Sequence, residues 1–100
     1  MVRNKHYNII WDDLALNQLQ DYLEYVYKQN PTAPRIIRDR ILNKLKVLQT
    51  NPLICEDDRL KDNNDGTYKS FTVYSYRITY RIMENSIIRV RHSSKEPLGY

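Results

Sequence analysis

The sequence predicts an α+β fold in which one strand and a helical hairpin precede a three-stranded antiparallel meander. Residues 68–92 are rich in β-branched and aromatic residues and are interrupted by only two short polar segments, which is typical of consecutive strands. Residues 12–48 instead place their apolar residues at helical spacing, in two stretches separated by Asn30-Pro31. We expect the helices to cover one face of the sheet and to leave the other face open and basic.

The first element is a short strand at residues 7–11, with Tyr7, Ile9 and Trp11 on one side. Its position in the sheet stays open at this stage. Asp12 and Asp13 then supply an N-cap and first-turn negative charge for a helix that runs to about residue 29. The apolar stripe expected for this helix is Ala15, Leu19, Tyr22, Leu23 and Val26.

A second helix begins after Thr32, which is a suitable cap, and its first turn tolerates Pro34. Asn51-Pro52 stops this helix. A short connection between the two helices predicts an antiparallel hairpin that lies on the sheet. The stripe expected to face the sheet is Ile37, Ile41, Leu45 and Leu48.

Residues 53–67, here called the acidic loop, form a polar connection with turn chemistry at Asn63-Asn64 and Gly66. The loop carries five acidic residues, but their spacing lacks the pattern of a calcium-binding loop. We therefore expect no metal site and no cofactor. Its acidic residues are Glu56, Asp57, Asp58, Asp62 and Asp65.

Alternation along the last two strands separates apolar from basic side chains, because successive strand residues point to opposite faces. One face is expected to hold Tyr76, Ile78, Tyr80, Ile82, Ile88 and Val90. The opposite face is expected to hold Arg77, Thr79, Arg81, Arg89 and Arg91. No acidic residue within these two strands offsets the arginines, so the pattern favours a surface that meets an anionic partner.

The apolar residues of both strands share a face only if a three-residue connection, residues 84–86, joins them, with Asn85 left-handed. This register sets Arg81 opposite Arg89 and Thr79 opposite Arg91. It also turns His92 toward the core, opposite Ile78. A two-residue joint at Tyr74-Ser75 sets Phe71 opposite Ile78 and Thr72 opposite Arg77.

The formal net charge of +4 lies entirely in the last third of the chain. Residues 1–65 contain ten basic and ten acidic residues, whereas residues 66–100 contain six basic and two acidic ones, so 6 − 2 = +4. The 100 residues fit a single domain spanning residues 1–100. A single cysteine, no membrane-length apolar run and no signal-peptide pattern predict a cytoplasmic protein.

This order of elements resembles the RelE/ParE superfamily of toxins from bacterial type II toxin–antitoxin systems. The resemblance covers nearly the whole chain and is carried by four segments. They are Trp11 with the acidic residues and Ala/Leu helix after it, the helix exit Leu48-x-x-x-Pro52, Tyr76-Arg77-Ile78-x-Tyr80-Arg81-Ile82, and Ile87-Ile88-Arg89-Val90-Arg91-His92.

The resemblance implies one of two activities. RelE-like members cut messenger RNA on the ribosome, and for that activity the candidate catalytic residues are Arg77, Arg81, His92 and Tyr100. ParE-like members poison DNA gyrase without nuclease residues. The short polar tail after Arg91-His92 is more similar to the ParE-like branch, which favours a gyrase inhibitor that is not an enzyme.

In both branches the resemblance implies growth arrest, a role in plasmid stabilisation, and a hetero-oligomer with a cognate antitoxin. The antitoxin would present an acidic, partly helical segment to the basic face. A second alternative is a non-toxic module that binds nucleic acid through this face. The residues expected on the target- or antitoxin-binding face are Tyr68, Thr72, Arg77, Arg81, Arg89, Arg91 and Lys95.

Overall fold

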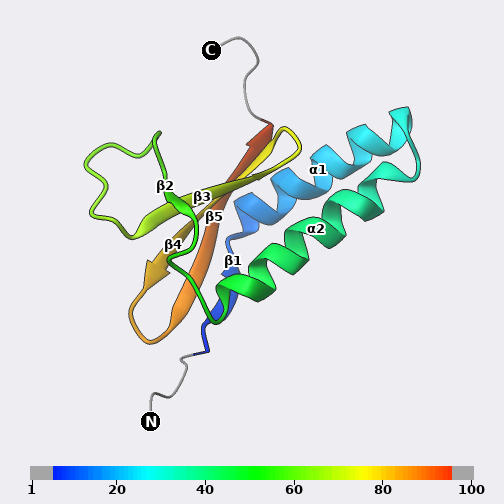
Figure 1. Cartoon of the computed structure of the whole chain (residues 1–100). Coiled ribbons are helices and arrows are strands. Elements are labelled where there is room, and N and C mark those ends of the chain that lie inside the picture. The colour runs from blue at the N-terminus through cyan, green and yellow to red at the C-terminus, as the bar shows by residue number, and fades with distance from the viewer. Residues whose placement is uncertain (1–5, 96–100) are drawn as a thin grey trace.

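A computed structural model describes residues 6–95 and shows an α+β arrangement in which two helices pack against one face of an open sheet (Figure 1). The predicted fold class is therefore confirmed. The elements are β1 (Asn8–Trp11), α1 (Asp13–Gln29), α2 (Ala33–Leu48), β2 (Glu56–Asp57), β3 (Tyr68–Val73), β4 (Tyr76–Met83) and β5 (Ile87–Lys95).

The sheet has the strand order β1-β5-β4-β3-β2. Strands β3, β4 and β5 form the predicted antiparallel meander. β1 joins the sheet beside β5 in parallel, with Asn8 opposite Ile87 and Trp11 opposite Val90. The two-residue β2, which the sequence did not predict, pairs with Lys69 and Ser70 of β3. The first strand of the chain therefore lies at one edge of the sheet, and the acidic loop supplies the other edge.

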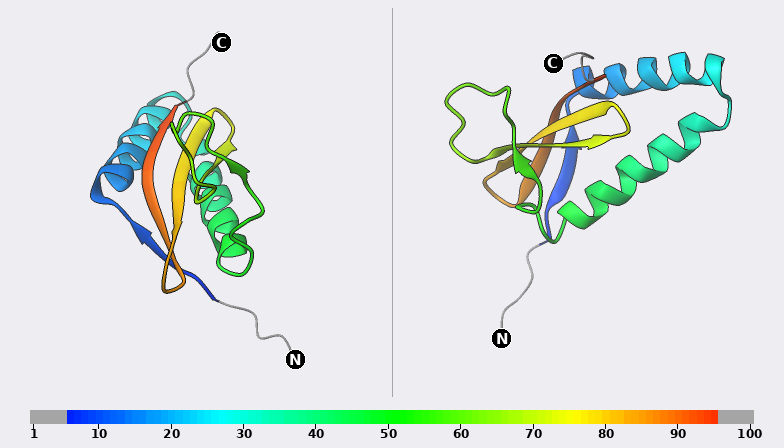
Figure 2. Two further views of the ribbon diagram at one scale, coloured as in Figure 1. Left: turned by 90° about the vertical axis from the view of Figure 1, so that its left-hand side faces the viewer. Right: turned by 45° about the horizontal axis from the view of Figure 1, so that its top comes forward.

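The helical hairpin covers the apolar face of the sheet and extends past its end (Figure 2). The predicted stripe of α2 is confirmed, because all four of its residues are buried. In α1, Ala15 and Leu19 are buried, and the rest of the predicted stripe packs against the core while partly exposed. On the sheet side, the apolar and aromatic residues with at most 1% exposure are Tyr76, Ile78, Tyr80, Ile88 and Val90.

The two predicted helix caps are wrong in their side-chain role. Asp12 and Thr32 occupy the N-cap positions, but neither side chain caps its helix. The carboxylate of Asp12 instead accepts a hydrogen bond from Arg89 of β5. Thr32 donates its backbone N–H to Asn30 Oδ1 at 3.1 Å. The polar residue before each helix thus stabilises a neighbouring segment rather than the helix terminus.

Both predicted connections of the meander are confirmed. Phe71 lies opposite Ile78 across the two-residue turn, and Tyr74 in that turn has a φ of +55°. Residues 84–86 join β4 to β5, and Asn85 has a φ of +63°, a conformation that asparagine tolerates better than most residues. Arg81 lies opposite Arg89, as the alternation predicted.

A β-bulge changes the register beyond that point. Tyr80 pairs with Val90, but Thr79 pairs with His92, so Arg91 is the extra residue. The predicted pairings of Thr79 with Arg91 and of Ile78 with His92 are therefore wrong. The shifted register has a physical reason in the residue after His92. The bulge turns Ser93 into the core opposite Ile78.

Ser93 is fully buried and its polar groups are satisfied. Its hydroxyl lies 2.6 Å from the Tyr76 hydroxyl and donates to the carbonyl of Ala15 at 3.0 Å. Its backbone N–H donates to Gln18 Oε1 at 2.9 Å. A small residue that hydrogen-bonds to α1 thus occupies the place where the regular alternation would have set the imidazole of His92.

Candidate functional site: the open face of the sheet

A groove of 510 Å³ lies on the face of the sheet opposite the helical hairpin. β4 and β5 form its floor, the acidic loop forms one wall, and Leu14 at the start of α1 forms the other. Its lining combines cations, one imidazole and apolar side chains. The residues that line it are Leu14, Asp58, Leu60, Lys61, Tyr68, Arg77, Thr79, Tyr80, Arg91, His92 and Ser94.

Arg77 lies on this face but is not an exposed cation. Its guanidinium donates to the carboxylate of Asp58, and the two side chains are only 6% and 11% exposed. Asp58 is itself fixed by the backbone N–H of Leu60, which donates to Oδ1 at 3.0 Å. Arg77, a candidate catalytic residue under the RNA-cleaving alternative, therefore does not present its guanidinium to solvent. A carboxylate from the acidic loop occupies that place.

Arg81 lies beside the same loop, where it stacks on an aromatic ring. Its guanidinium carbon lies 4.7 Å from the ring centroid of Tyr68, and Lys61 Nζ lies 4.9 Å from the same centroid. Arg81 Nε also donates to Thr67 Oγ1 at 3.4 Å. Hydrogen bonds from Thr67, assisted by the charge of Arg81, hold the pKa of Asp65 below its ordinary value.

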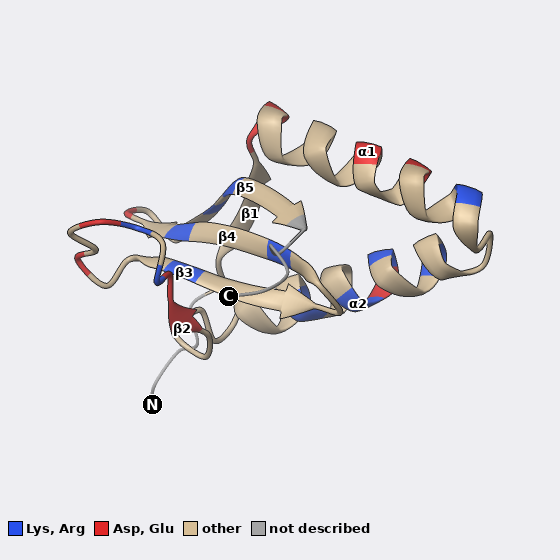
Figure 3. Cartoon of the chain, turned by 90° about the horizontal axis from the view of Figure 1, so that it is seen from above, with Lys and Arg blue, Asp and Glu red and all other residues tan. Residues whose placement is uncertain are grey.

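Arg89 pairs with Asp12, at the start of α1. The sequence correctly showed no acid within β4 and β5 to offset Arg81 and Arg89. It gave no sign that carboxylates from outside these strands approach three of the arginines. Figure 3 shows the acidic residues of the loop and β2 beside the basic residues of the strands. The open face is therefore less cationic than the strand sequences alone indicated.

Two further cations line the groove, Arg91 at the bulge and Lys61 on the acidic loop. His92, predicted to face the core, is exposed and lines the groove beside Arg91. Tyr68 is half-buried, and Thr72 is exposed opposite Arg77, as predicted. The side chain of Lys95 and all of Tyr100 lie outside the described residues.

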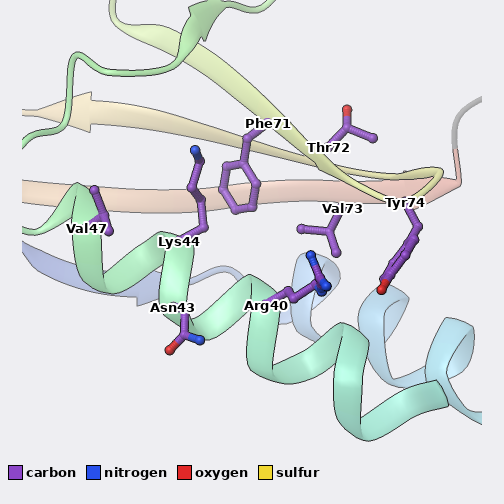
Figure 4. Close-up of a pocket in the computed structure, with 8 residues that line it drawn as sticks. All are labelled: Arg40, Asn43, Lys44, Val47, Phe71, Thr72, Val73 and Tyr74. Atoms are coloured by element: carbon purple, nitrogen blue, oxygen red, sulfur yellow. The ribbon is translucent and has the colours of Figure 1, made fainter.

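A second groove, of 480 Å³, lies between α2 and β3 (Figure 4). Arg40 and Lys44 extend from α2 toward the side of the groove that Phe71 and Val73 form. The guanidinium carbon of Arg40 lies 5.3 Å from the ring centroid of the exposed Tyr74. This groove is basic and apolar at once, and it runs along the margin of the sheet. The sequence analysis did not predict this groove, because it considered only the buried apolar residues of α2.

Burial raises the pKa of three phenols under the sheet. The pKa of Tyr80 is raised most, by desolvation and by the neighbouring Cys55 thiol, and its hydroxyl donates to the Pro52 carbonyl at 2.9 Å. Desolvation also raises the pKa of Tyr76 and of Tyr22, whose rings stack at 4.2 Å. The three phenols are therefore harder to ionise than exposed tyrosines, and their rings pack in or against the core.

Within residues 6–95, no three His, Cys, Asp or Glu side chains gather closely enough to hold a metal ion. The same part of the chain contains no helix with the length and apolar character needed to cross a membrane.

Residues 9–97 match the family model described as ParE toxin of the type II toxin–antitoxin system parDE. The chain belongs to the ParE toxin family. The predicted resemblance to the RelE/ParE superfamily is therefore confirmed, and this ParE-family chain is a toxin of the type II toxin–antitoxin class. Comparison with the sequences of curated proteins gives no match.

Solved structures with the same fold come from both branches of the superfamily. The chromosomal ParDE system of P. aeruginosa gives a TM-score of 0.70 at 13% identity, over 92% of this chain and 98% of the other. The RelBE2 toxin–antitoxin complex of Mycobacterium tuberculosis gives 0.65 at 17% identity, over 94% and 95%. TrmO of P. aeruginosa gives 0.52 at 14% identity, over 94% of this chain but 35% of the other. At these identities the likeness concerns the fold alone.

Proposed function

We propose that this ParE-family toxin inhibits DNA gyrase by binding to it, and that a cognate antitoxin neutralises the toxin. The observation that carries the choice of target is the ion pair of Arg77 with Asp58. Cleavage of RNA needs donors aimed at the charge that develops on the phosphate. In this chain the arginine expected for that task is buried and already bound to a carboxylate, which favours a toxin that acts by binding a protein.

The groove between α2 and β3 is the surface we assign to the antitoxin. β2 pairs only with Lys69 and Ser70, so the rest of β3, as far as Val73, lies at the margin of the sheet. An extended segment can add to such a margin through its backbone. Arg40 and Lys44 flank the margin and would meet acidic side chains of the partner. We therefore expect a hetero-oligomer whose affinity falls as salt rises.

The test measures supercoiling by purified gyrase in the presence of the purified chain. We expect supercoiling to stop and cleaved DNA to accumulate, and addition of the antitoxin to restore supercoiling. Unchanged supercoiling with no cleaved DNA would rule out this target. Induced expression of the chain without a partner gene is expected to arrest growth with a DNA-damage response; normal growth would favour the non-toxic module.

One observation favours cleavage of messenger RNA as a second candidate function. The bulge at Arg91 exposes His92 in the groove, where an imidazole can act as a general base. His92→Gln is the discriminating variant, because the side chain is exposed and its loss leaves the fold intact. Under the second candidate, codon-positioned cuts in ribosome-bound message disappear in His92→Gln. Under the first, the variant inhibits gyrase as well as the parent chain does.

A further inference from the structure

The acidic loop has an arrangement opposite to that of an ordinary surface loop. Two of its leucines project into solvent, with Leu53 69% and Leu60 64% exposed. The carboxylate-bearing Asp58 is instead nearly buried against the sheet, with its side chain 11% exposed. Charged side chains are seldom buried unless they are paired. The loop thus places carboxylates next to cations of the strands.

Several independent contacts fix the loop in this position. Asp57 anchors its beginning, where Lys69 Nζ lies 2.7 Å from Oδ1. Asp58 binds Arg77 on the open face, and its backbone N–H donates to the carbonyl of Tyr68 at 2.9 Å. Asn64 donates to the same carbonyl at 2.8 Å. The carboxylate at residue 58 therefore has a defined place on the open face.

The end of the loop brings a second carboxylate to the same face. Thr67 donates its backbone N–H to Asp65 Oδ1 at 3.0 Å, and its hydroxyl accepts from Arg81 Nε at 3.4 Å. Asp58 and Asp65 thus lie at neighbouring arginines of β4 and are joined by six intervening loop residues. Together they resemble an acidic peptide that is already bound to the sheet.

We propose that the acidic loop is an internal competitor that occupies the place of an acidic peptide segment from a protein partner at Arg77 and Arg81. The inference rests on the proposed function only in assuming a protein partner. Because the loop is covalently joined to β3, its effective concentration at the site is in the millimolar range. A partner segment must displace the loop, so the loop sets a threshold for binding at the open face.

The ligand is a peptide rather than a single-stranded nucleic acid because of Tyr68. Single strands bind through bases that stack on exposed aromatic rings. Lys61 in the groove and Arg81 beside it both lie over the Tyr68 ring, at 4.9 and 4.7 Å, and therefore compete with a base for it. Leu14 and Leu60 in the groove lining would instead contact apolar side chains of a peptide.

The probe is a fluorescein-labelled synthetic peptide with the sequence of residues 53–67, titrated with the full chain and followed by fluorescence anisotropy. We expect Asp58→Asn to bind it at least about tenfold more tightly than the parent chain, because losing one charge-assisted hydrogen bond weakens the loop's own docking. The gain is expected to shrink at high salt. Equal affinity of the parent chain and the variant would overturn the inference.

Asp62→Asn is the matched control, since Asp62 is exposed in the same loop and the substitution removes the same charge. An equal gain in this control would mean a general charge effect and would overturn the inference. Should Asp58→Asn fail to fold, the peptide titration is repeated with Asp57→Asn. The Asp57 side chain is 60% exposed, so this substitution only weakens the ion pair of the loop with Lys69. No gain in Asp57→Asn would then refute the competitor.

A single-stranded oligonucleotide serves as the second probe. A larger gain for the oligonucleotide than for the peptide in Asp58→Asn would contradict the assignment to a peptide ligand. The measurement contains no gyrase, so a negative result in the supercoiling assay leaves its outcome unaffected. The two proposals therefore fail separately.

Discussion

Replacement of Arg77 by methionine should strongly destabilise the fold, because it leaves the Asp58 carboxylate without its cation. Both side chains are nearly buried, at 6% and 11% exposure. Breaking such a pair by removing one partner costs about 3–5 kcal/mol. A domain of this size has a stability of about 5–15 kcal/mol, so Tm should fall by roughly 12 °C or more.

Urea unfolding followed by circular dichroism measures the loss in the free energy of unfolding. Two further variants are measured for comparison. Arg91→Met removes an exposed groove cation and should change the free energy of unfolding by less than about 0.5 kcal/mol. Arg77→Met combined with Asp58→Leu should recover most of the loss, since a buried ion pair can be replaced by apolar side chains. A loss below about 1 kcal/mol in Arg77→Met would refute the buried pair. It would also reopen Arg77 as a phosphate donor.

Ser93→Ala should lower the free energy of unfolding by about 1–3 kcal/mol in urea titration, because it leaves the buried Tyr76 hydroxyl without its partner at 2.6 Å. Ile78→Ala, at 0% exposure, should cost about 2–5 kcal/mol in the same assay, whereas Leu60→Ala should cost less than about 0.5. Burial raises the pKa of Tyr80 above 10.0, so the unfolded chain ionises first and stability should fall as the pH rises above about 10. Urea midpoints that stay constant from about pH 9 to 11 would contradict this.

Alternation of side chains predicted most of the meander correctly. The apolar residues from Tyr76 to Ile82 and those at Ile88 and Val90 could share a face in only one register, and that register required the three-residue connection. The bulge lies just where this information ends. Residues 92–94 are His-Ser-Ser, with no apolar residue to report which face they occupy. The buried serine could have been found only from its hydrogen bonds to α1.

The charge pattern predicted where cations lie on the sheet but not their partners. Arg89 meets an acid 77 residues earlier, and Arg77 meets one 19 residues earlier. Ion pairs have no sequence period, so no spacing rule connects these positions. The excess of acids in the acidic loop was the available signal. The spacing of these acids argued against a calcium-binding loop but did not indicate that two of them form ion pairs with strand cations.

The parallel pairing of β1 with β5 determines when the toxin can exist as a folded protein. Asn8 lies opposite Ile87, a separation of 87 − 8 = 79 residues in a chain of 100. Closing so long a segment of chain is entropically unfavourable and slows folding. A nascent chain lacks the partner strand of β1 until β5 has been synthesised. The five-stranded sheet therefore cannot be completed while residues 87–95 are still being synthesised.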